Sequence, residues 1–220
     1  MSFLERGVNM IKVKLGKHPK DDVERIHQIR KAVGNDIQLR IDANQGWTYD
    51  EALYALTELG HFHIQFCEQP MRKWNDGLLP KLVKQSPIPI MADESVFTHH
   101  DAERLIKQHA CSYVNIKFAK SGGIHEAKKI NQVCAQHETA CMMGGMLESR
   151  VALTAKVHFA MAHENIRFYD LDTCLLGHKE DPVIGGVTYH NGMHLQLTDA
   201  PGIGVDVDPN YLKKLDHIQI

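Results

Sequence analysis

Apolar and polar residues along this chain alternate between segments with the period of a β-strand and segments with the period of an α-helix. Short runs with strand character predict seven β-strands, at residues 11–15, 37–42, 63–68, 89–93, 112–117, 139–143 and 166–171. The stretches between them carry apolar residues three and four positions apart, which predicts helices at 21–33, 48–60, 76–86, 99–109, 122–137 and 148–164. Strands that alternate with helices through short loops are expected to be parallel and joined by right-handed crossovers.

Two architectures satisfy this alternation, an open doubly wound sheet and a (β/α) barrel, and the polar residues choose between them. A polar side chain recurs about every 25 residues through the middle strands, where each predicted strand ends. These residues are Lys14, Asp42, Glu68, Asp93, Lys117 and Asp170. In a barrel all strand ends face one mouth, whereas an open sheet uses the crevice at its switch point. With no G-x-G-x-x-G after the first strand and no Walker A motif, we predict an α/β protein with a TIM-type (β/α) barrel.

The predicted barrel has about seven strands instead of the usual eight. Residues 1–9 have the character of a helix end that leads into the strand at 11–15, so we expect the first barrel strand to be missing. We therefore predict an incomplete barrel domain at 1–178 and a C-terminal tail at 179–220. In the tail, the sequence His190-Asn191-Gly192 predicts a hairpin.

Three acids end three neighbouring predicted strands. Adjacent parallel strands lie about 4.8 Å apart, so we expect Asp42, Glu68 and Asp93 to converge at the mouth. Three uncompensated carboxylates would repel one another, and a hard divalent cation would relieve that repulsion. An all-oxygen set without His or Cys favours Mg²⁺ over zinc. Each acid alone could instead cap the next helix, but three in register, followed by a lysine in register, favour a metal site.

Lysines flank the three acids on both sides. Lys12 and Lys14 share one face of the first predicted strand, a pattern that by itself is typical of a solvated surface. In a barrel they lie beside the strand of Asp42, and Lys117 approaches from the strand after Asp93. We expect a lysine near another cation and a metal to have a lowered pKa and to act as a base. This arrangement predicts proton removal next to a metal-bound carboxylate and proton return on the opposite face.

Composition narrows the class of protein further. The chain has 220 residues, 43% hydrophobic and 24% charged, with a formal net charge of −2 and no basic block, which argues against nucleic-acid or membrane-surface partners. No apolar stretch approaches the roughly 20 residues of a membrane span, and the N-terminus lacks the layout of a signal peptide. The five cysteines are scattered, which favours reduced thiols and a cytoplasmic location.

Five motifs together resemble the enolase superfamily, and within it the muconate-lactonizing subgroup. They are "KVK" at 12–14, "DAN" at 42–44, "EQP" at 68–70, "DES" at 93–95 and "IKFAKSGG" at 116–123. The resemblance implies an acid/base pair, Lys14 and Lys117, with Lys12 tuning Lys14. It also implies Asp42, Glu68 and Asp93 as Mg²⁺ ligands. Family members carry a capping domain and a first barrel strand before this region. We therefore expect a truncated chain, or one completed by association with another copy as a homo-oligomer.

A further acidic pair, Asp170 and Asp172, follows the last predicted strand and bears on the substrate. Such a D-x-D is also common at solvated strand ends and helix caps. At this position it resembles the dipeptide epimerases of the subgroup, including L-Ala-D/L-Glu epimerases, and implies that the two acids hold the ammonium group of a dipeptide. The function implied is Mg²⁺-dependent epimerisation by two-base 1,1-proton transfer. The alternatives are an o-succinylbenzoate synthase-like or muconate cycloisomerase-like reaction, or a truncated non-catalytic remnant.

Overall fold

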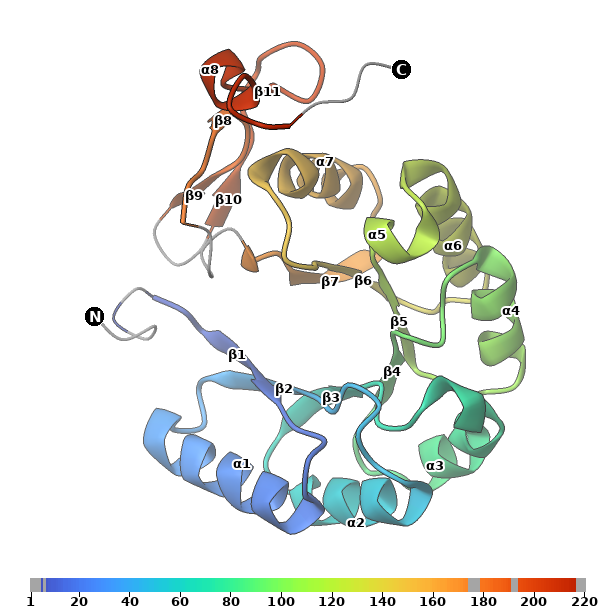
Figure 1. The fold of residues 1–220 in the computed structure, drawn as a ribbon. Coiled ribbons are helices and arrows are strands. Elements are labelled where there is room, and N and C mark those ends of the chain that lie inside the picture. The colour runs from blue at the N-terminus through green and yellow to red at the C-terminus, as the bar shows by residue number, and fades with distance from the viewer. Residues whose placement is uncertain (1–4, 6, 174–178, 191–193, 217–220) are drawn as a thin grey trace.

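The computed structural model describes residues 5, 7–173, 179–190 and 194–216. Its centre is one parallel sheet whose strands lie side by side in sequence order, as predicted (Figure 1). The strands are β1 (Met10–Lys14), β2 (Gln38–Asp42), β3 (Ile64–Glu68), β4 (Ile90–Ala92), β5 (Tyr113–Ile116), β6 (Cys141–Gly144) and β7 (Ile166–Asp170). The prediction of an α/β, barrel-type fold with seven strands is confirmed.

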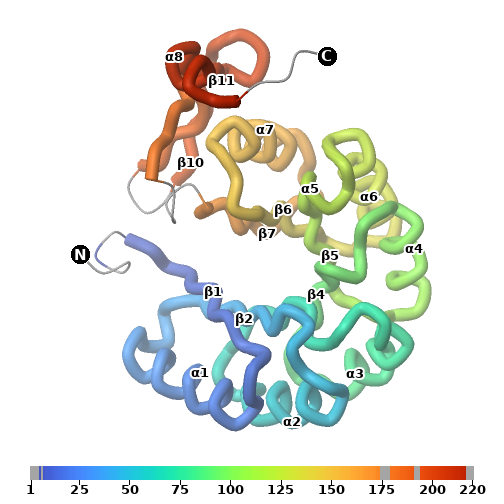
Figure 2. The backbone as a smooth tube through the Cα atoms, in the orientation of Figure 1, coloured from blue at the N-terminus to red at the C-terminus, as the bar shows by residue number. Residues whose placement is uncertain are grey.

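Helices cover the outer face of the curled sheet (Figure 2). They are α1 (Pro19–Val33), α2 (Tyr49–Leu59), α3 (Leu79–Gln85), α4 (His99–Lys107), α5 (Phe118–Ser121), α6 (Ile124–Gln136) and α7 (Arg150–Met161), with a 3₁₀ segment η2 (Lys73–Leu78) before α3. The predicted helix at 76–86 begins later, at Leu79, because Pro80 suits a first helical turn and Asn75 interrupts the preceding turns with non-helical angles. In the described part of the chain, no helix has the length and apolar character that a membrane crossing requires.

Threonines cap the helices that follow the acidic strand ends. Thr48 and Glu51 form a reciprocal capping box on α2, and Thr98 and Asp101 form one on α4. Asp42 and Asp93 are therefore not needed as helix caps. Their carboxylates are left for contacts inside the sheet.

The sheet curls until its two end strands approach each other. Among the described residues, β1 and β7 each pair with one neighbour only. Side chains nevertheless cross the interior: the Arg40 guanidinium on β2 donates to the main-chain oxygen of Tyr169 on β7 at 2.9 Å. Arg40 also lies over the rings of Phe66 and Phe168, at 5.0 and 5.3 Å from their centroids. A buried cation that contacts both aromatic rings holds the curl together.

Apolar side chains form two layers around the sheet. The larger layer lies between strands and helices and contains residues such as Leu39, Ile41 and Leu56, all fully buried. The smaller layer fills the inside of the curl with Phe66, Met91 and Met142, packed against Tyr113 and Phe168. This inner layer forms the floor beneath the strand-end polar groups.

Two glycines let the loops after β1 and β2 touch through their backbones. A Cβ at Gly16, which has a φ of +91°, would lie 2.0 Å from the carbonyl oxygen of Ala43. A Cβ at Gly46 would lie 1.9 Å from the carbonyl oxygen of Gly16. Neither position accommodates a side chain, so the two loops pack together directly.

The C-terminal tail packs against α7 (Figure 2). It contains β8 (Val183–Gly185), β9 (Thr188–His190), β10 (His194–Gln196), β11 (Val205–Val207) and α8 (Pro209–Leu212). The antiparallel pairing of β9 with β10 confirms the predicted hairpin strands; the turn, 191–193, lies outside the described residues. Arg150 on α7 donates to Asp181, at 2.6 Å, and to the main-chain oxygens of Val183 and Gly185.

Candidate active site

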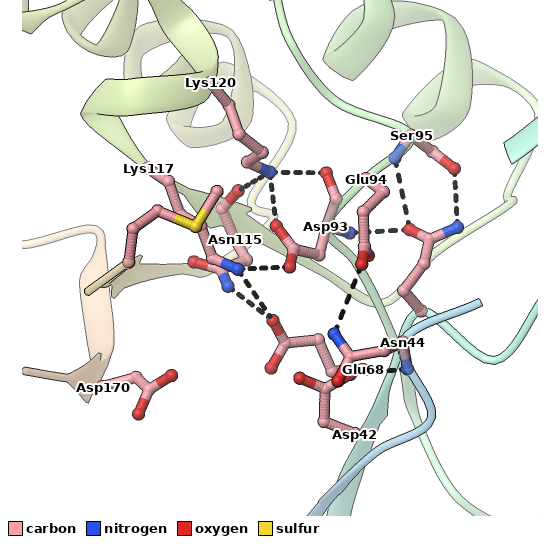
Figure 3. A network of polar contacts seen from close by, with 12 residues as sticks. Asp42, Asn44, Glu68, Asp93, Glu94, Ser95, Asn115, Lys117, Lys120 and Asp170 are labelled. Atoms are coloured by element: carbon pink, nitrogen blue, oxygen red, sulfur yellow. Dashed lines mark hydrogen bonds and ion pairs between the residues drawn. The ribbon is translucent and has the colours of Figure 1, made fainter. Parts of the chain in front are cut away.

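The predicted polar side chains gather inside the curl, at the carboxyl ends of the strands (Figure 3). The register explains this, because Lys14 lies beside Asp42 and Asp42 beside Glu68 in the strand pairings. Asp42, Glu68 and Asp93 are each completely buried. The strand ends therefore place three carboxylates in a row.

Lys14 pairs with the first acid of the row. Its Nζ lies 2.5 Å from Oδ2 of Asp42, and its side chain is 58% exposed. The other oxygen, Oδ1, accepts a hydrogen bond from the main-chain N–H of Asn44 at 2.9 Å. Lys14 thus reaches the site from its solvent side, and a main-chain donor fixes Asp42.

Lys12 lies deeper and contacts three acids. Its Nζ lies 3.3 Å from Oε2 of Glu68 and 3.7 Å from Oδ2 of Asp42, and it forms an ion pair with Asp170. The last contact joins β1 to β7 across the curl. The structure therefore places Lys12 between the row of acids and the D-x-D segment.

Lys117 pairs with the third acid of the row. Its Nζ lies 2.5 Å from Oδ2 of Asp93 and 3.9 Å from Oε1 of Glu68. Lys14 and Lys117 therefore bind opposite ends of the row, with Glu68 between them. This is the order of charges that the sequence predicts.

The acid–base behaviour of Glu68 is strongly perturbed. Burial, and then the charge of Asp42, raise its pKa to about 8, although Lys12 and Lys117 act in the opposite direction. Its Oε1 accepts a hydrogen bond from the Asn115 amide at 2.6 Å. Glu68 is therefore the acid in which the negative charge of the site is least well compensated.

The protein's own charges raise the pKa values of Lys12 and Lys117. The expected lowering was for a lysine beside another cation and a bound metal, so it stays a prediction for the metal-bound site. Burial alone would lower the pKa of Lys117, and the charges of Asp93 and Glu68 raise it above its usual value. The pKa of Lys12 is raised likewise, against burial, by Glu68, Asp170 and Asp42. The carboxylates that surround these lysines outweigh the effect of neighbouring cations.

Asp170 and Asp172 lie at the opposite end of the sheet from the Lys14 strand. Asp170 ends β7 and meets Lys12, whereas Asp172 follows the strand. Burial, and then the charge of Asp170, raise the pKa of Asp172. Two negative charges that lie near each other, one of them partly removed from water, attract a cation.

Sequence reasoning missed a layer of polar residues behind the acids. Gln69 accepts a hydrogen bond from the main-chain N–H of Asp93 at 2.8 Å and donates to Ser95 Oγ at 2.7 Å. Ser95 donates in turn to Asp76 at 2.6 Å. Lys120 and Asn115 back Asp93 and Glu68 in the same way. Their place in the sequence could have indicated this role, because Gln69 and Ser95 belong to the "EQP" and "DES" motifs that contain Glu68 and Asp93.

The donor set fits a hard cation. The three acids supply only oxygen, which Mg²⁺ prefers, and the raised pKa of Glu68 shows that more positive charge would be accommodated. Three buried side-chain oxygens in this region, Oδ1 of Asp93, Oε2 of Glu94 and Oδ1 of Asn115, accept no hydrogen bond from the described residues, although Oδ1 of Asp93 forms an ion pair with Lys120. In the part of the chain that the structure describes, however, no three His, Cys, Asp or Glu side chains are spaced as a metal shell. The ammonium groups of Lys12 and Lys117 bridge the acids instead.

In (β/α)-barrel enzymes the active site lies at the carboxyl ends of the strands. The curled parallel sheet, with acids and lysines at its strand ends, therefore defines a domain of this class. The chain belongs to the enolase C-terminal domain-like family, whose model matches residues 2–211. The resemblance that the motifs indicated is confirmed.

Curated relatives are similar over most of this chain. An L-Ala-D/L-Glu epimerase of Clostridium acetobutylicum is 44% identical over 202 residues, 91% of this chain and 56% of that protein. A D-Ala-D/L-Ala epimerase of Cytophaga hutchinsonii is 42% identical over 216 residues, 98% of this chain and 58% of that protein. The chain thus spans little more than half the length of these relatives.

Solved structures agree with this placement. A dipeptide epimerase from Cytophaga hutchinsonii, complexed with Mg and the dipeptide D-Ala-L-Val, is 42% identical with a TM-score of 0.94; the match covers 97% of this chain and 58% of that one. A muconate cycloisomerase from Pseudomonas fluorescens is 30% identical with a TM-score of 0.90, over 96% of this chain and 59% of that one. The same domain fold therefore occurs in proteins of both names.

Proposed function

We propose that this protein is an Mg²⁺-dependent isomerase that epimerises dipeptides of the L-Ala-D/L-Glu type. The observation that carries the proposal is the placement of two lysines at the ends of a row of buried acids. Lys14 lies 2.5 Å from Asp42, and Lys117 lies 2.5 Å from Asp93. Two amines on opposite sides of one site suit removal of a proton from one face of a carbon and its return to the other.

Asp42, Glu68 and Asp93 are the residues that would hold Mg²⁺. When bound there, the ion would bind the substrate carboxylate and stabilise negative charge that develops next to it. Two solved dipeptide epimerase complexes that resemble this chain contain Mg together with a dipeptide. They support the choice of ion.

Lys14 and Lys117 are the proposed acid/base pair. One amine takes the proton from the carbon next to the substrate carboxylate, and the other ammonium donates a proton to the opposite face, which inverts the centre. Lys12, between Asp42 and Glu68, contributes positive charge beside Lys14. The pKa of Lys117 is raised in the folded chain, and a base must lose its proton. Positive charge from a bound metal would lower this pKa and so favour the neutral amine.

Asp170 and Asp172 are proposed to hold the substrate's ammonium group. Their carboxylates lie on the β7 side of the site, and Lys12 spans the distance from Asp170 to the row of acids. A substrate with an ammonium at one end and a carboxylate beside the reacting carbon matches this order of charges. The substrates in the names of the relatives, L-Ala-D/L-Glu and D-Ala-D/L-Ala, are dipeptides.

A cycloisomerase-like reaction is the second candidate, since a muconate cycloisomerase has a TM-score of 0.90 with this chain. An o-succinylbenzoate synthase-like reaction would use the same lysines and ion. Neither substrate carries an ammonium, which would leave Asp170 and Asp172 without a substrate partner. The D-x-D segment therefore favours the dipeptide.

Proton exchange in D₂O tests the proposal. The chain is incubated with Mg²⁺ and L-Ala-L-Glu, and ¹H NMR follows the glutamyl α-proton. We expect loss of that proton and growth of the D-Glu epimer, both abolished in a Lys14→Ala/Lys117→Ala double variant that reports any contaminating enzyme. A folded chain that binds Mg²⁺ but exchanges no proton would contradict the proposal and support a non-catalytic remnant.

Three further expectations remain predictions. The free thiols of Cys67, Cys111, Cys134 and Cys141 are compatible with a cytoplasmic location, and Cys174 lies outside the described residues. Association into a homo-oligomer, which would supply a neighbour to the end strands β1 and β7, is to be measured by light scattering. The boundary between barrel and tail at 178/179 is to be measured by limited proteolysis.

A further inference from the structure

Lys120 is a buried cation that the proposed reaction does not use. It belongs to α5, the single helical turn after β5, and its side chain is only 5% exposed. Its Nζ contacts Oδ1 of Asp93 at 2.5 Å and donates to the main-chain oxygens of Asp93 and Asn115. Burial of an ammonium group costs free energy, and these three oxygen partners compensate for that cost.

The turn that carries Lys120 is built from the sequence Lys117-Phe118-Ala119-Lys120. Lys117 occupies the position before the first residue of α5, and the N–H of Lys120 bonds back to the Lys117 oxygen at 3.0 Å. Residues three apart lie on the same side of a helical turn. Gly122 and Gly123, with φ of +75° and +116°, then end the turn in conformations that favour glycine. The segment 117–123 thus directs both lysines to one acid.

The two lysines bind different oxygens of Asp93. Lys117 takes Oδ2 and Lys120 takes Oδ1, each at 2.5 Å. Figure 3 shows Lys120 on the side of Asp93 that faces away from Glu68 and Asp42. With one oxygen tied on that side, rotation of the carboxylate is restricted and Oδ2 stays turned toward Lys117. Among the described residues, the acids within 4 Å of the Lys117 amine are Asp93 at 2.5 Å and Glu68 at 3.9 Å, so the nearer one, Asp93, determines where the amine lies.

We propose that Lys120 is a positioning residue that holds Lys117, but not Lys14, in place for its half of the reaction, by fixing the Asp93 carboxylate. The proposal rests on the proposed two-base function. It predicts an asymmetric defect: a change at Lys120 disturbs only the face of the substrate that Lys117 serves. Lys14 is bound to Asp42, whose second oxygen is held independently by Asn44.

The first test measures α-proton exchange in D₂O separately from L-Ala-L-Glu and L-Ala-D-Glu. Lys117→Ala identifies the epimer whose exchange depends on Lys117. In Lys120→Gln, which keeps a donor for the main-chain oxygens but removes the charge, exchange from that epimer should fall about 10- to 100-fold. Exchange from the other epimer should stay within about threefold of the wild type, as should both rates in Lys120→Arg. Equal losses from both epimers, or none, would overturn the proposal.

A second test needs no turnover and so separates this proposal from the proposed function. The chain is labelled with [ε-¹³C]lysine, and the Lys117 and Lys14 signals are identified from their alanine variants. Lys120→Gln should shift the Lys117 signal and leave that of Lys14 in place. Lys128→Gln, a control at an exposed lysine of α6, should shift neither. An unmoved Lys117 signal would overturn the role of Lys120 even if the enzyme is active; if the wild type exchanges no proton, the signals alone decide.

Discussion

The guanidinium of Arg40 on β2 donates a hydrogen bond to the main-chain oxygen of Tyr169 on β7, five strands further along the sheet. The same side chain donates to Gln65 at 2.6 Å and lies over the rings of Phe66 and Phe168. A contact between strands so far apart requires a strongly curled sheet. Arg40 therefore connects the strand of Asp42 to the strand of Asp170 below the site.

Replacement of Arg40 by methionine should destabilise the fold. Both hydrogen bonds are lost, and with them the link between β2 and β7, so we expect the free energy of unfolding to fall by about 2 to 4 kcal/mol. Urea denaturation monitored by circular dichroism measures this change. The matched control is Arg72→Met, because Arg72 also lies over an aromatic ring, Trp74, but on the surface. That variant should lose less than about 1 kcal/mol; similar losses in both would contradict a role in holding the curl.

Each single alanine variant of the two proposed bases should lose epimerisation by a factor of about 10² to 10⁴. Exchange of the α-proton should survive from one epimer in Lys14→Ala and from the other in Lys117→Ala, because each retains one amine. NMR in D₂O measures both quantities in one experiment. Lys128→Ala, at an exposed site, should behave as the wild type. Normal epimerisation by either variant would show that the two-base assignment is wrong.

Changing the D-x-D segment should affect the substrate more than the ion. In Asp170→Asn and Asp172→Asn we expect the KM for L-Ala-L-Glu to rise about 10- to 100-fold, the loss typical of a hydrogen bond between charged groups. The affinity for Mg²⁺, measured by calorimetry, should change by less than about threefold. An equal loss of Mg²⁺ affinity would instead make these acids part of the metal site.

The raised pKa of Glu68 predicts a dependence of stability on pH. Its ordinary pKa is 4.5 and its pKa in the folded chain is about 8, so between these values the folded state binds more protons than the unfolded state. Stability from this group is therefore present at low pH and is lost as the pH rises through that window. Denaturation curves from pH 5 to 9 without divalent ions should show the wild type losing stability relative to Glu68→Gln. A constant difference between the two proteins would contradict the raised pKa.

The order of the strands and the row of acids could be predicted because both depend on local rules. Parallel strands joined by helices bring their carboxyl ends to one edge, so the spacing of Asp42, Glu68 and Asp93 was sufficient. The contact of Lys12 with Asp170 could not be predicted, since it depends on how far the whole sheet curls. Lys120 was missed because α5 is one turn of four residues, too short to show a period.

Contacts between strands also explain two features that the sequence did not predict, the register of β2 and β3 and the pKa values of the lysines. The sequence does not show the irregular register between β2 and β3, which lies opposite Gln65 and brings that side chain to Arg40. The expected lowering of the lysine pKa values assumed a bound metal beside the neighbouring cations. In the folded chain itself, Lys12 and Lys117 are surrounded by more acids than any single strand reveals, and these acids raise both pKa values.

The direct backbone contact at Gly16 and Gly46 also determines how this end of the site can move. The loop that follows Lys14 and the loop that follows Asp42 meet without intervening side chains, so neither can swing without carrying the other. Lys14 and Asp42 therefore travel as one rigid unit. Any hinge that widens the entrance has to lie elsewhere in the chain, and a bulkier residue at either glycine would force the two halves of this unit apart.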